Sequence, residues 1–505
     1  MKRIKYILSV ALLVFGVTAC DDFGDINVDP NQMSNPETTH LLLGAEMRIP
    51  FFSINDTYNP WTQVNAGYFS EPRNFQFTRF TPALLQFANG RLYTQPIHNC
   101  EKVIAMNREE NNPRTGALGG GKNNQIAVAE TLRAYYYMHI ADATGMTPYF
   151  EAIKALEGKH APKYDSMKDI YADLDKRLTE AYKMFDPGKK LNGRFEILYK
   201  GDIVKWKKLN ASLRMMMAIK LADVDPAAGK ERFARAFADG GLETDGTAVL
   251  GDGDTFAFPY LKENDNANLL YKNIILAGRR DFSPSHYVVD NFLALNDPRI
   301  VDYATPLSDG TYVGCPFGVK NEKSIPYSEF TQKYYQQDAA QEVISAAHIK
   351  LLQAEAALRG WITGSASKYY VEGIQQAFNN CGIGEGMVFP QLAPELLAKL
   401  KANVLVASYV AQPAVALTGD MASDLKKIAM QRWLNNYLKD GVEAWSDIRR
   451  LDWPFIEPGK DASDKKMPLR MAYHPDDYDA NKKNYEEATA IQPDKTTTRL
   501  WWDVK

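Results

Sequence analysis

Residues 127–138 read AVAETLRAYYYM, and their apolar side chains recur at helical spacing. They cover a wide face of the predicted helix, which indicates that this helix packs against others. The aromatic side chains of Tyr135, Tyr136 and Tyr137 are therefore expected in the core, as is that of Trp206 farther along the chain. This stretch favours a helical protein body.

The same period of apolar residues predicts a series of helices along the chain. The predicted helices cover residues 38–48, 125–141, 166–183, 203–222, 339–359, 369–379 and 421–438. Gly360 directly follows one of them, and glycine is a common helix terminator. Small residues recur at the contact positions of paired helices, as they do in tetratricopeptide repeats. The sequence therefore predicts an all-α dominated fold built of tetratricopeptide-like helix pairs.

Loop-rich segments interrupt the predicted helices. Residues 240–285 are rich in glycine and aspartate and lack a helical period, which predicts loop with short extended pieces. Long loops within compact domains are usually functional or disordered. After Arg450 the chain is rich in proline, aspartate and asparagine, so we expect a tail that wraps around the body. We predict one helical domain over residues 37–505, with loop-rich insertions at about 50–125 and 240–338.

The N-terminus has the composition of an export signal. Basic residues near the start precede an apolar run over residues 7–17, which is shorter than the roughly 20 apolar residues that cross a bilayer. Residues 17–20 resemble a bacterial lipobox, which implies cleavage before Cys20 and attachment of lipid to its thiol. Residues 1–19 would then be a signal peptide and residues 20–36, rich in Asn, Asp and Pro, a lipidated tether. Several acyl chains hold a protein on a membrane that it does not span.

Composition and charge exclude several classes of protein. The 505 residues are 45% hydrophobic and 24% charged, which is typical of a globular chain. A formal net charge of -3 and the lack of a long basic run argue against nucleic-acid binding, because that affinity depends on neutralising phosphates. Beyond Cys20, the wide spacing of Cys100, Cys315 and Cys381 supports neither a zinc site nor a disulfide framework. We expect no metal and no cofactor.

Enzyme signatures are scarce. The sequence holds no His-Glu-x-x-His zinc motif and no Gly-x-Ser-x-Gly nucleophile motif. Residues 116–122 have the spacing of a phosphate-binding loop, but Asn123 replaces the Ser or Thr that binds magnesium. Residues 111–114, just before it, predict loop where such a site needs a strand, so we favour a flexible helix-entry loop. Pairs among the 62 acidic residues suit glycoside hydrolysis too, and the sequence leaves that open.

Aromatic residues are the most informative part of the composition, because many of the 27 Tyr, 23 Phe and 8 Trp lie in predicted loops. Aromatic faces suit the apolar C–H patches of sugar rings, and nearby Asn, Asp and Arg side chains supply hydrogen bonds. The best candidate segment covers residues 58–80 and contains Trp61, Tyr68, Arg73, Asn74, Phe75 and Phe77. The second covers residues 280–287 and contains Arg280, Asp281 and Tyr287. Packing in the core is the alternative for each residue.

Short segments spread over most of the chain resemble the SusD/RagB family of outer-membrane nutrient-binding lipoproteins, in its SusD-like branch. The similar segments are residues 27–31, 132–137, 145–149, 162–165, 202–206, 210–214, 296–299, 353–361, 431–433, 441–445, 449–450 and 470–475, with Asn481 and Asn484 after them. Their order along the chain carries the resemblance. One departure lies at residues 144–148, where many members have a Trp-Gly-Asp-x-Pro turn and this chain keeps only its Gly145 and Pro148.

The resemblance implies four tetratricopeptide-like helix pairs and a loop-rich region that carries the ligand site. Members of the family form a lid over a SusC-like TonB-dependent transporter and capture glycans, or peptides in some members, without catalysis. The resemblance thus implies a lipid-anchored protein of the outer membrane, facing the cell exterior, that binds a glycan or oligosaccharide and delivers it to the transporter. A peptide ligand and a surface glycan hydrolase are the alternatives.

Overall fold

A computed structural model describes residues 35–53, 60–72, 76–81, 84–87, 90–243, 253–319, 326–463 and 465–505. The predicted signal peptide, Cys20 and most of the predicted tether lie outside the described residues. The contacts of Thr38–Lys505 gather into one compact unit. Among the described residues, no helix combines the length and the apolar character that crossing a bilayer requires.

Helices make up most of the structure, and the strands are short. The α-helices are α2 (Thr38–Glu46), α3 (Trp61–Asn65), α4 (Gly90–Leu92), α5 (His98–Arg108), α6 (Gly121–Thr144), α7 (Met167–Met184), α8 (Ile203–Ile219), α9 (Pro226–Ala238), α10 (Leu269–Tyr271), α11 (His286–Ala294), α12 (Ile300–Tyr303), α13 (Ala346–Leu358), α14 (Ala366–Asn380), α15 (Pro394–Lys401), α16 (Val406–Val410), α17 (Met421–Asn436), α18 (Gly441–Leu451) and α19 (Pro475–Ile491). Short 3-10 or π segments are η2 (Ile49–Phe52), η4 (Tyr93–Ile97), η5 (Pro113–Thr115), η6 (Ala155–Glu157), η7 (Asn264–Asn266), η8 (Lys272–Leu276) and η9 (Gln332–Tyr335).

The strands pair two by two. The antiparallel pairs are β1 (Phe69–Ser70) with β6 (Ser283–Pro284), β3 (Thr147–Pro148) with β4 (Tyr164–Asp165), and β5 (Phe256–Phe258) with β7 (Gln341–Ile344). The parallel pair is β2 (Gln86–Phe87) with β8 (Ala472–Tyr473). Three of these pairs join segments far apart in the chain, whereas β3 and β4 follow one another along it.

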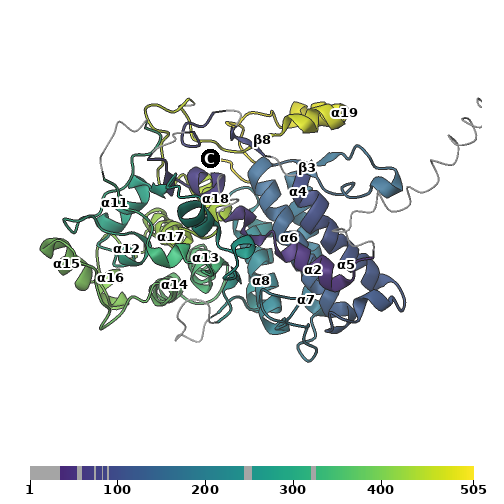
Figure 1. Cartoon of the computed structure of the whole chain (residues 1–505), viewed down its shortest axis with the longest axis horizontal. Helices are drawn as coiled ribbons and strands as arrows, with labels where there is room; N and C mark the ends of the chain where they lie inside the picture. Colours follow the sequence, from purple (N-terminus) through teal and green to yellow (C-terminus); the bar gives the residue numbers. More distant parts are fainter. Residues whose placement is uncertain are drawn as a thin grey trace, which may run out of the picture. The chain divides into compact units, whose positions relative to one another are not determined.

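Consecutive helices pack as pairs: α6 with α7, α8 with α9, α13 with α14, and α17 with α18. The pairs also touch one another, because α6 and α7 both contact α8, and α13 contacts both α8 and α17. Figure 1 shows α6, α7 and α8 together in the blue part of the chain and α13, α14 and α17 together in the green part. The prediction of a helix-dominated fold with paired helices is confirmed.

Helix α6 is the interior helix that the sequence predicted. Its residues from Asn124 to Thr144 are all buried, and the hydroxyl of Tyr136 donates a hydrogen bond of 2.6 Å to the Ala45 carbonyl of α2. The helix ends at Gly145, whose φ is +84°. With a ψ of -118° as well, this backbone conformation is one that residues with a β-carbon rarely adopt, so the turn favours glycine.

Short polar side chains start many of the helices. In each case an oxygen of the residue before the helix accepts a hydrogen bond from a first-turn N–H that has no partner within the helix. These residues are Ser166 (α7), Asp202 (α8), Asp225 (α9), Ser285 (α11), Ser345 (α13), Ser365 (α14), Asp420 (α17) and Asp440 (α18). At the other end of α13, Gly360 has a φ of +70° and stops the helix as predicted.

The predicted helix over residues 339–359 is wrong in its first part. Residues Gln341–Ile344 form β7, and the helix begins only at Ala346. All four residues of β7 are buried, and Val343 and Ile344 are β-branched, a shape that suits a buried strand. Ser345 then has an extended backbone and caps α13, so the strand passes directly into the helix.

Several helices lie where the sequence predicted loop or tail. Helix α5 falls within the predicted insertion at residues 50–125, and α19 lies in the C-terminal tail. Helix α19 buries only Ala488, so its sequence has no apolar period to detect. Its start does carry a signal: the His474 side chain accepts a hydrogen bond from the backbone of the first turn, the Asp477 side chain bonds back, and Pro475 opens the helix.

A cluster of charged side chains is buried where α13, α17 and α18 meet. Glu355 of α13 accepts hydrogen bonds from Arg432 (2.6 Å) and from Arg450 (2.7 and 2.8 Å). Asp447 accepts from both arginines as well. We call these four residues the arginine–carboxylate cluster. All four side chains are almost completely buried, so ion pairs as well as apolar contacts join the three helices.

Candidate ligand-binding site

The two candidate segments of the sequence lie side by side. Strand β1, from the first segment, pairs antiparallel with β6, from the second. Phe282 packs against both Phe69 and Phe77, with ring centroids 6.1 and 6.0 Å apart. Two stretches more than 200 residues apart in the chain therefore form one loop region.

The first segment sends two of its candidate rings into the core. Trp61, only 4% exposed, packs edge-on against Trp445 at 6.2 Å. Tyr68 is buried against the ring of Trp433 at 4.9 Å, and its hydroxyl donates to the Trp433 carbonyl. Both rings are occupied by packing. The candidates Arg73, Asn74 and Phe75 lie outside the described residues, and Phe77 is half-buried against Phe282.

The polar candidates of the second segment bind the surrounding loops. Arg280 forms an ion pair with Glu329, and both side chains are partly exposed. Asp281 is buried and pairs with Arg279 at 2.6 Å. The Tyr287 hydroxyl donates to the Glu457 carbonyl at 3.1 Å and accepts from the Glu457 N–H at 3.0 Å. The Tyr287 contact ties the second segment to the C-terminal part of the chain, whereas Asp281 pairs within its own loop and Arg280 reaches the loop of Glu329.

Phe80 and Phe317 form the centre of this loop region. Their ring centroids are 5.9 Å apart, and Tyr287 packs edge-on against Phe317 at 5.7 Å. The backbone N–H of Phe317 donates to Nδ1 of His286 at 3.2 Å, and burial lowers the pKa of this imidazole. Phe80 also lines an open pocket.

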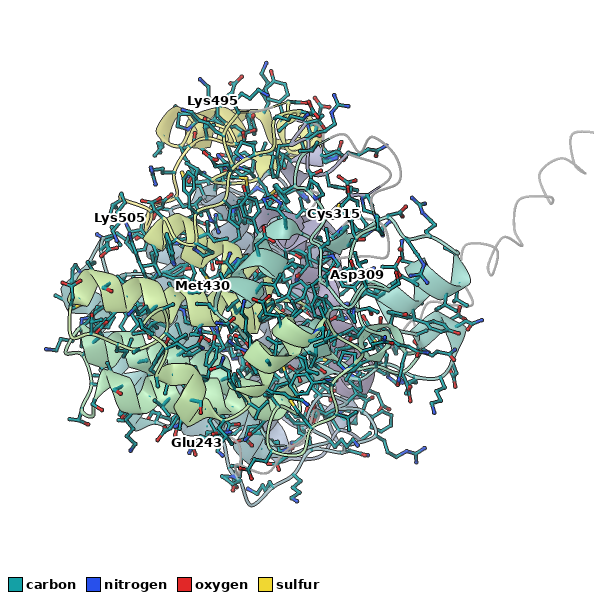
Figure 2. The ribbon with its side chains drawn as sticks, turned by 90° about the vertical axis from the view of Figure 1, so that its left-hand side faces the viewer. Glu243, Asp309, Cys315, Met430, Lys495 and Lys505 are labelled. Carbon is teal, nitrogen blue, oxygen red and sulfur yellow. The ribbon has the colours of Figure 1, made fainter. Side chains whose placement is uncertain are left out.

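This open pocket has a volume of about 500 Å³ and carries three tyrosines from β8 and α19. Its lining residues are Phe80, Leu85, Gln86, Ala472, Tyr473, His474, Pro475, Tyr478, Tyr485, Asp494, Lys495, Thr496 and Thr497. We call it the tyrosine pocket. Figure 1 shows β8 and α19 together in the yellow C-terminal part of the chain, and Figure 2 shows Lys495 at the outer edge of that part.

The rings of the tyrosine pocket are held at fixed angles. Tyr485 packs edge-on against Tyr473 at 5.8 Å and against Tyr478 at 5.4 Å. Between Tyr478 and Tyr485 the backbone of Asn481 is not helical (φ -144°, ψ 42°), so α19 bends there while the two rings remain in contact. Tyr478 remains 39% exposed, so part of its ring is open to a ligand.

Asp494 organises the polar side of the pocket. It accepts a hydrogen bond from the Tyr473 N–H at 3.1 Å and another from the Tyr485 hydroxyl at 2.9 Å. Burial and the bond to Asp494 raise the pKa of Tyr485 to about 12, so this hydroxyl stays protonated at neutral pH. Arg470 forms an ion pair with Asp494 at 3.1 Å and balances its charge.

The pocket thus offers aromatic surface beside amide, hydroxyl, carboxylate and ammonium groups. Such a surface can stack on the C–H face of a ring and hydrogen-bond its polar rim. Within the described residues, no group of three His, Cys, Asp or Glu side chains is arranged to hold a metal ion.

The sequence did not point to the tyrosine pocket, because its rings lie in the tail that was expected only to wrap around the body. The Tyr478 and Tyr485 rings meet across the non-helical backbone of Asn481, so no regular spacing in the sequence predicts their contact.

The glycine-rich stretch with phosphate-loop spacing has a different structure from a phosphate site. Residues Pro113–Thr115 before it form the 3-10 segment η5, where a phosphate loop needs a strand. Lys122 lies in the first turn of α6 and donates to the Glu109 carbonyl at 2.8 Å. The stretch is a helix entry, as the sequence favoured.

Comparison with known proteins places the chain in a family. The family model SusD-like_2, described as starch-binding associating with outer membrane, matches residues 30–474. No curated protein matches the chain.

Solved structures share its fold. One is named a chitin-binding protein, with 24% identity and a TM-score of 0.75 over 93% of this chain and 100% of that one. A SusD homologue from Bacteroides uniformis has 22% identity and a TM-score of 0.72, over 92% of this chain and 100% of its own. A SusD homologue from Bacteroides fragilis has 20% identity and a TM-score of 0.73, over 93% and 100%. Because the family model spans most of the chain, this protein belongs to the SusD/RagB family, in its SusD-like branch.

Proposed function

We propose that this protein binds a glycan at the cell surface through the tyrosine pocket. The observation that carries the proposal is the contact between the Tyr478 and Tyr485 rings, 5.4 Å apart in the pocket, beside the polar groups that surround Asp494. The family description as starch-binding and the chitin-binding name of one similar structure support a glycan over other ligands.

The chemistry of the pocket suits a sugar chain. The open part of the Tyr478 ring can stack on the C–H face of one sugar unit. The Tyr485 hydroxyl donates to Asp494, so its lone pairs are free to accept from a sugar hydroxyl, and Gln86 and Thr497 offer further donors and acceptors. The pocket is open to solvent at one side, as binding within a longer chain requires.

The proposal extends to the membrane and to a partner. Lipid on Cys20 holds the protein on the outer membrane, facing the cell exterior, and a SusC-like TonB-dependent transporter receives the bound glycan. These steps rest on the lipobox of residues 17–20 and on membership of the family. Mass spectrometry of the mature protein tests the anchor: a diacylated or triacylated Cys20 supports it, and an unmodified thiol with the leader attached contradicts it.

The binding test uses the chain without residues 1–20 and a panel of maltooligosaccharides and chitin oligosaccharides, measured by calorimetry and affinity electrophoresis. We expect Tyr478→Ala to weaken binding about fivefold or more, because loss of an aromatic stacking face costs about 1 kcal/mol. Tyr182→Ala is the matched control: this partly buried tyrosine lies on α7 and lines no part of the pocket. Equal affinity in wild type and Tyr478→Ala, or binding of peptides in place of glycans, overturns the proposal.

Binding without catalysis is part of the proposal. Prolonged incubation of the bound glycan with the protein should release no new reducing ends. Release that disappears in a variant of a paired carboxylate would instead establish the hydrolase alternative.

A further inference from the structure

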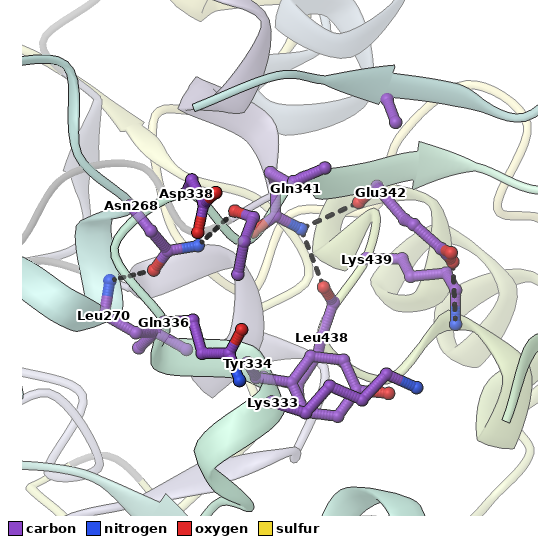
Figure 3. A pocket seen from close by; sticks show the side chains of 13 residues that line it. Asn268, Leu270, Lys333, Tyr334, Gln336, Asp338, Gln341, Glu342, Leu438 and Lys439 are labelled. Atoms are coloured by element: carbon purple, nitrogen blue, oxygen red, sulfur yellow. Dashed lines mark hydrogen bonds and ion pairs between the residues drawn. The ribbon is translucent and has the colours of Figure 1, made fainter. Parts of the chain in front are cut away.

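A second cavity lies beside the β5–β7 strand pair and shares no lining residue with the tyrosine pocket. Its volume is about 310 Å³. The lining residues, drawn in Figure 3, are Ala257, Asn268, Leu270, Lys333, Tyr334, Gln336, Asp338, Ala339, Ala340, Gln341, Glu342, Leu438 and Lys439. We call it the strand cavity.

Several chain segments form the walls of the strand cavity, and hydrogen bonds between them hold these walls in place. The Gln341 side-chain amide donates to the carbonyls of Glu342 and Leu438, both at 2.7 Å. The Asn268 amide donates to the Ala339 carbonyl at 2.9 Å, and its oxygen accepts from the Leu270 N–H at 2.8 Å. Figure 3 shows these amides bridging the segments. A cavity with walls held in this way loses little conformational entropy when a ligand enters.

One charged side chain of the strand cavity is already neutralised. The Lys333 ammonium donates to both carboxylate oxygens of Asp302, at 2.7 and 2.9 Å, and the Tyr334 hydroxyl donates to the same carboxylate at 2.6 Å. The Tyr334 ring in turn stacks on Tyr303 at 5.5 Å. This side of the cavity is rigid and electrically balanced.

Glu342 and Lys439 differ, because their hydrogen-bonding capacity is not filled. The Glu342 side chain is only 10% exposed, and its Oε2 atom has no hydrogen-bond partner. The Lys439 ammonium forms an ion pair with this oxygen at 3.6 Å, too long for a hydrogen bond, and donates to the Tyr303 hydroxyl at 3.0 Å and the Asn435 carbonyl at 2.8 Å. An ammonium has three N–H groups, so one donor remains beside one open acceptor. A buried acceptor without a hydrogen bond is costly even beside an ammonium, and a ligand that supplies a donor recovers part of that cost.

The composition of the lining selects a neutral ligand with several hydroxyl groups. Two carboxylates, Asp338 and Glu342, and two ammoniums, Lys333 and Lys439, line the cavity, so neither an anion nor a cation is favoured overall. Neighbouring hydroxyls of a sugar can donate to a carboxylate and accept from an ammonium a few ångströms away. The apolar side chains of Leu270 and Leu438 suit the C–H groups of the same ring.

We propose that the strand cavity is a second sugar site, which takes a single neutral sugar ring or the end of a glycan chain. Its volume is at the lower end of the range of ligand pockets, about 300 to 1,000 Å³, which excludes a long chain. The proposal rests on the proposed function in its ligand class, but it concerns different residues. The protein then holds a chain in the tyrosine pocket and a small unit in the strand cavity.

The experiment measures saturation-transfer NMR signals of D-glucose, D-galactose, D-mannose and N-acetyl-D-glucosamine with the chain lacking residues 1–20. Ala340→Trp places a ring at the exposed wall of the cavity and should abolish the signals. Glu342→Gln keeps the size of the side chain, removes its charge, and should weaken binding about fivefold or more. Thermal unfolding and circular dichroism of each variant check its folding, and Glu342→Gln decides the question if Ala340→Trp does not fold.

The outcomes separate this proposal from the proposed function. Absence of signal for every sugar, or signals unchanged in both Ala340→Trp and Glu342→Gln, overturns the second site whatever the tyrosine pocket binds. Monosaccharide signals that vanish in Ala340→Trp but persist in Tyr478→Ala support it. If they do so while the oligosaccharides fail to bind the tyrosine pocket, the second site stands and the proposed function falls.

Discussion

The residues of the arginine–carboxylate cluster explain why several of the family-like segments lie where they do. Glu355 comes from the segment at residues 353–361, Arg432 from residues 431–433 and Arg450 from residues 449–450. Burial alone would raise the pKa of the Glu355 carboxyl, but the guanidinium groups of Arg450 and Arg432 hold it well below its ordinary value. A carboxylate buried in this way stays charged and specifies which helix faces meet.

Removing one partner of the cluster should destabilise the protein strongly. Glu355→Gln leaves Arg450 without its main partner and Arg432 with Asp447 alone, and breaking a buried pair costs about 3 to 5 kcal/mol. The midpoint of urea unfolding, followed by circular dichroism, should fall accordingly. The control is Glu395→Gln, which removes an exposed pair with Lys399 and should leave the midpoint unchanged. Equal midpoints for wild type and Glu355→Gln would contradict a stabilising role.

The same carboxylate predicts how stability depends on pH. Because the folded pKa of Glu355 lies below its unfolded value of about 4.3, its contribution is complete above that pH and is lost as pH falls through the folded pKa. The pH dependence that His139 contributes has the opposite sign. Burial lowers the pKa of this imidazole, but Asp440 raises it by more, so the folded pKa lies above the ordinary value. The stability that His139 contributes is therefore lost as pH rises through the folded pKa. We expect the midpoint of urea unfolding to decrease as the pH is lowered below about 5. The decrease per pH unit should be smaller in Glu355→Gln. If the urea midpoint changed equally with pH in the wild type and in Glu355→Gln, Glu355 would not be a source of the pH dependence.

At the scale of the elements, the residue between β7 and α13 forms hydrogen bonds with two helices. Ser345 separates the strand from the helix, and its hydroxyl accepts from the His348 N–H at 3.2 Å. The Asn435 amide of α17 donates to the same hydroxyl at 3.1 Å. One side chain therefore starts a helix and joins it to a neighbouring helix.

Loss of this side chain should cost more than loss of an ordinary helix cap. Ser345→Ala removes the cap, worth about 1 kcal/mol, and leaves the buried Asn435 amide with one partner fewer, which adds about 1 kcal/mol. Ser365→Ala removes the exposed cap of α14 and is the matched control, with a cost of about 1 kcal/mol. Urea unfolding of the two variants measures the difference. Identical costs would show that the bond to Asn435 contributes nothing.

The elements also show how far sequence reasoning reaches. Helix α6 was predictable because it is buried along its length, and the end of α13 because Gly360 has a positive φ. Strand β7 was missed because its four residues, two polar and two apolar, are too few next to a helix to show a period of their own. Helix α19 was missed because it is polar on nearly all sides.

The candidate site, too, was predicted from the sequence in part and missed in part. The sequence found the two segments that β1 and β6 bring together, because their aromatic content is visible in the composition. It could not tell that Trp61 and Tyr68 turn into the core, since that depends on contacts with Trp445 and Trp433 far along the chain. The tyrosine pocket depends on the fold of the tail, which composition does not reveal.

At the scale of the whole molecule, residues near the C-terminus pack against the interior helix α6 and against α18. Trp502 is fully buried, and its indole N–H donates to the Asp142 side chain of α6 at 3.1 Å. The Arg449 guanidinium lies over the rings of Trp445 and Trp502, at 3.6 and 4.9 Å from their centroids. Residues 494–497 of the tyrosine pocket lie between α19 and this anchor. The last residues therefore secure both the interior helix and one wall of the candidate site.

This arrangement predicts that one change at the C-terminus affects stability and binding together. Trp502→Ala should destabilise the protein by about 3 to 5 kcal/mol, because it empties a buried site and leaves Asp142 and Arg449 with one contact fewer. At a temperature where the variant remains folded, it should also bind the oligosaccharide more weakly than wild type, because residues 494–497 lose their anchor. Deletion of Val504 and Lys505, which are both exposed, is the control and should change neither quantity much. Calorimetric affinity and thermal unfolding of the same samples decide the matter: a less stable Trp502→Ala with unchanged affinity would mean that the tail wall of the tyrosine pocket is held by α19 alone.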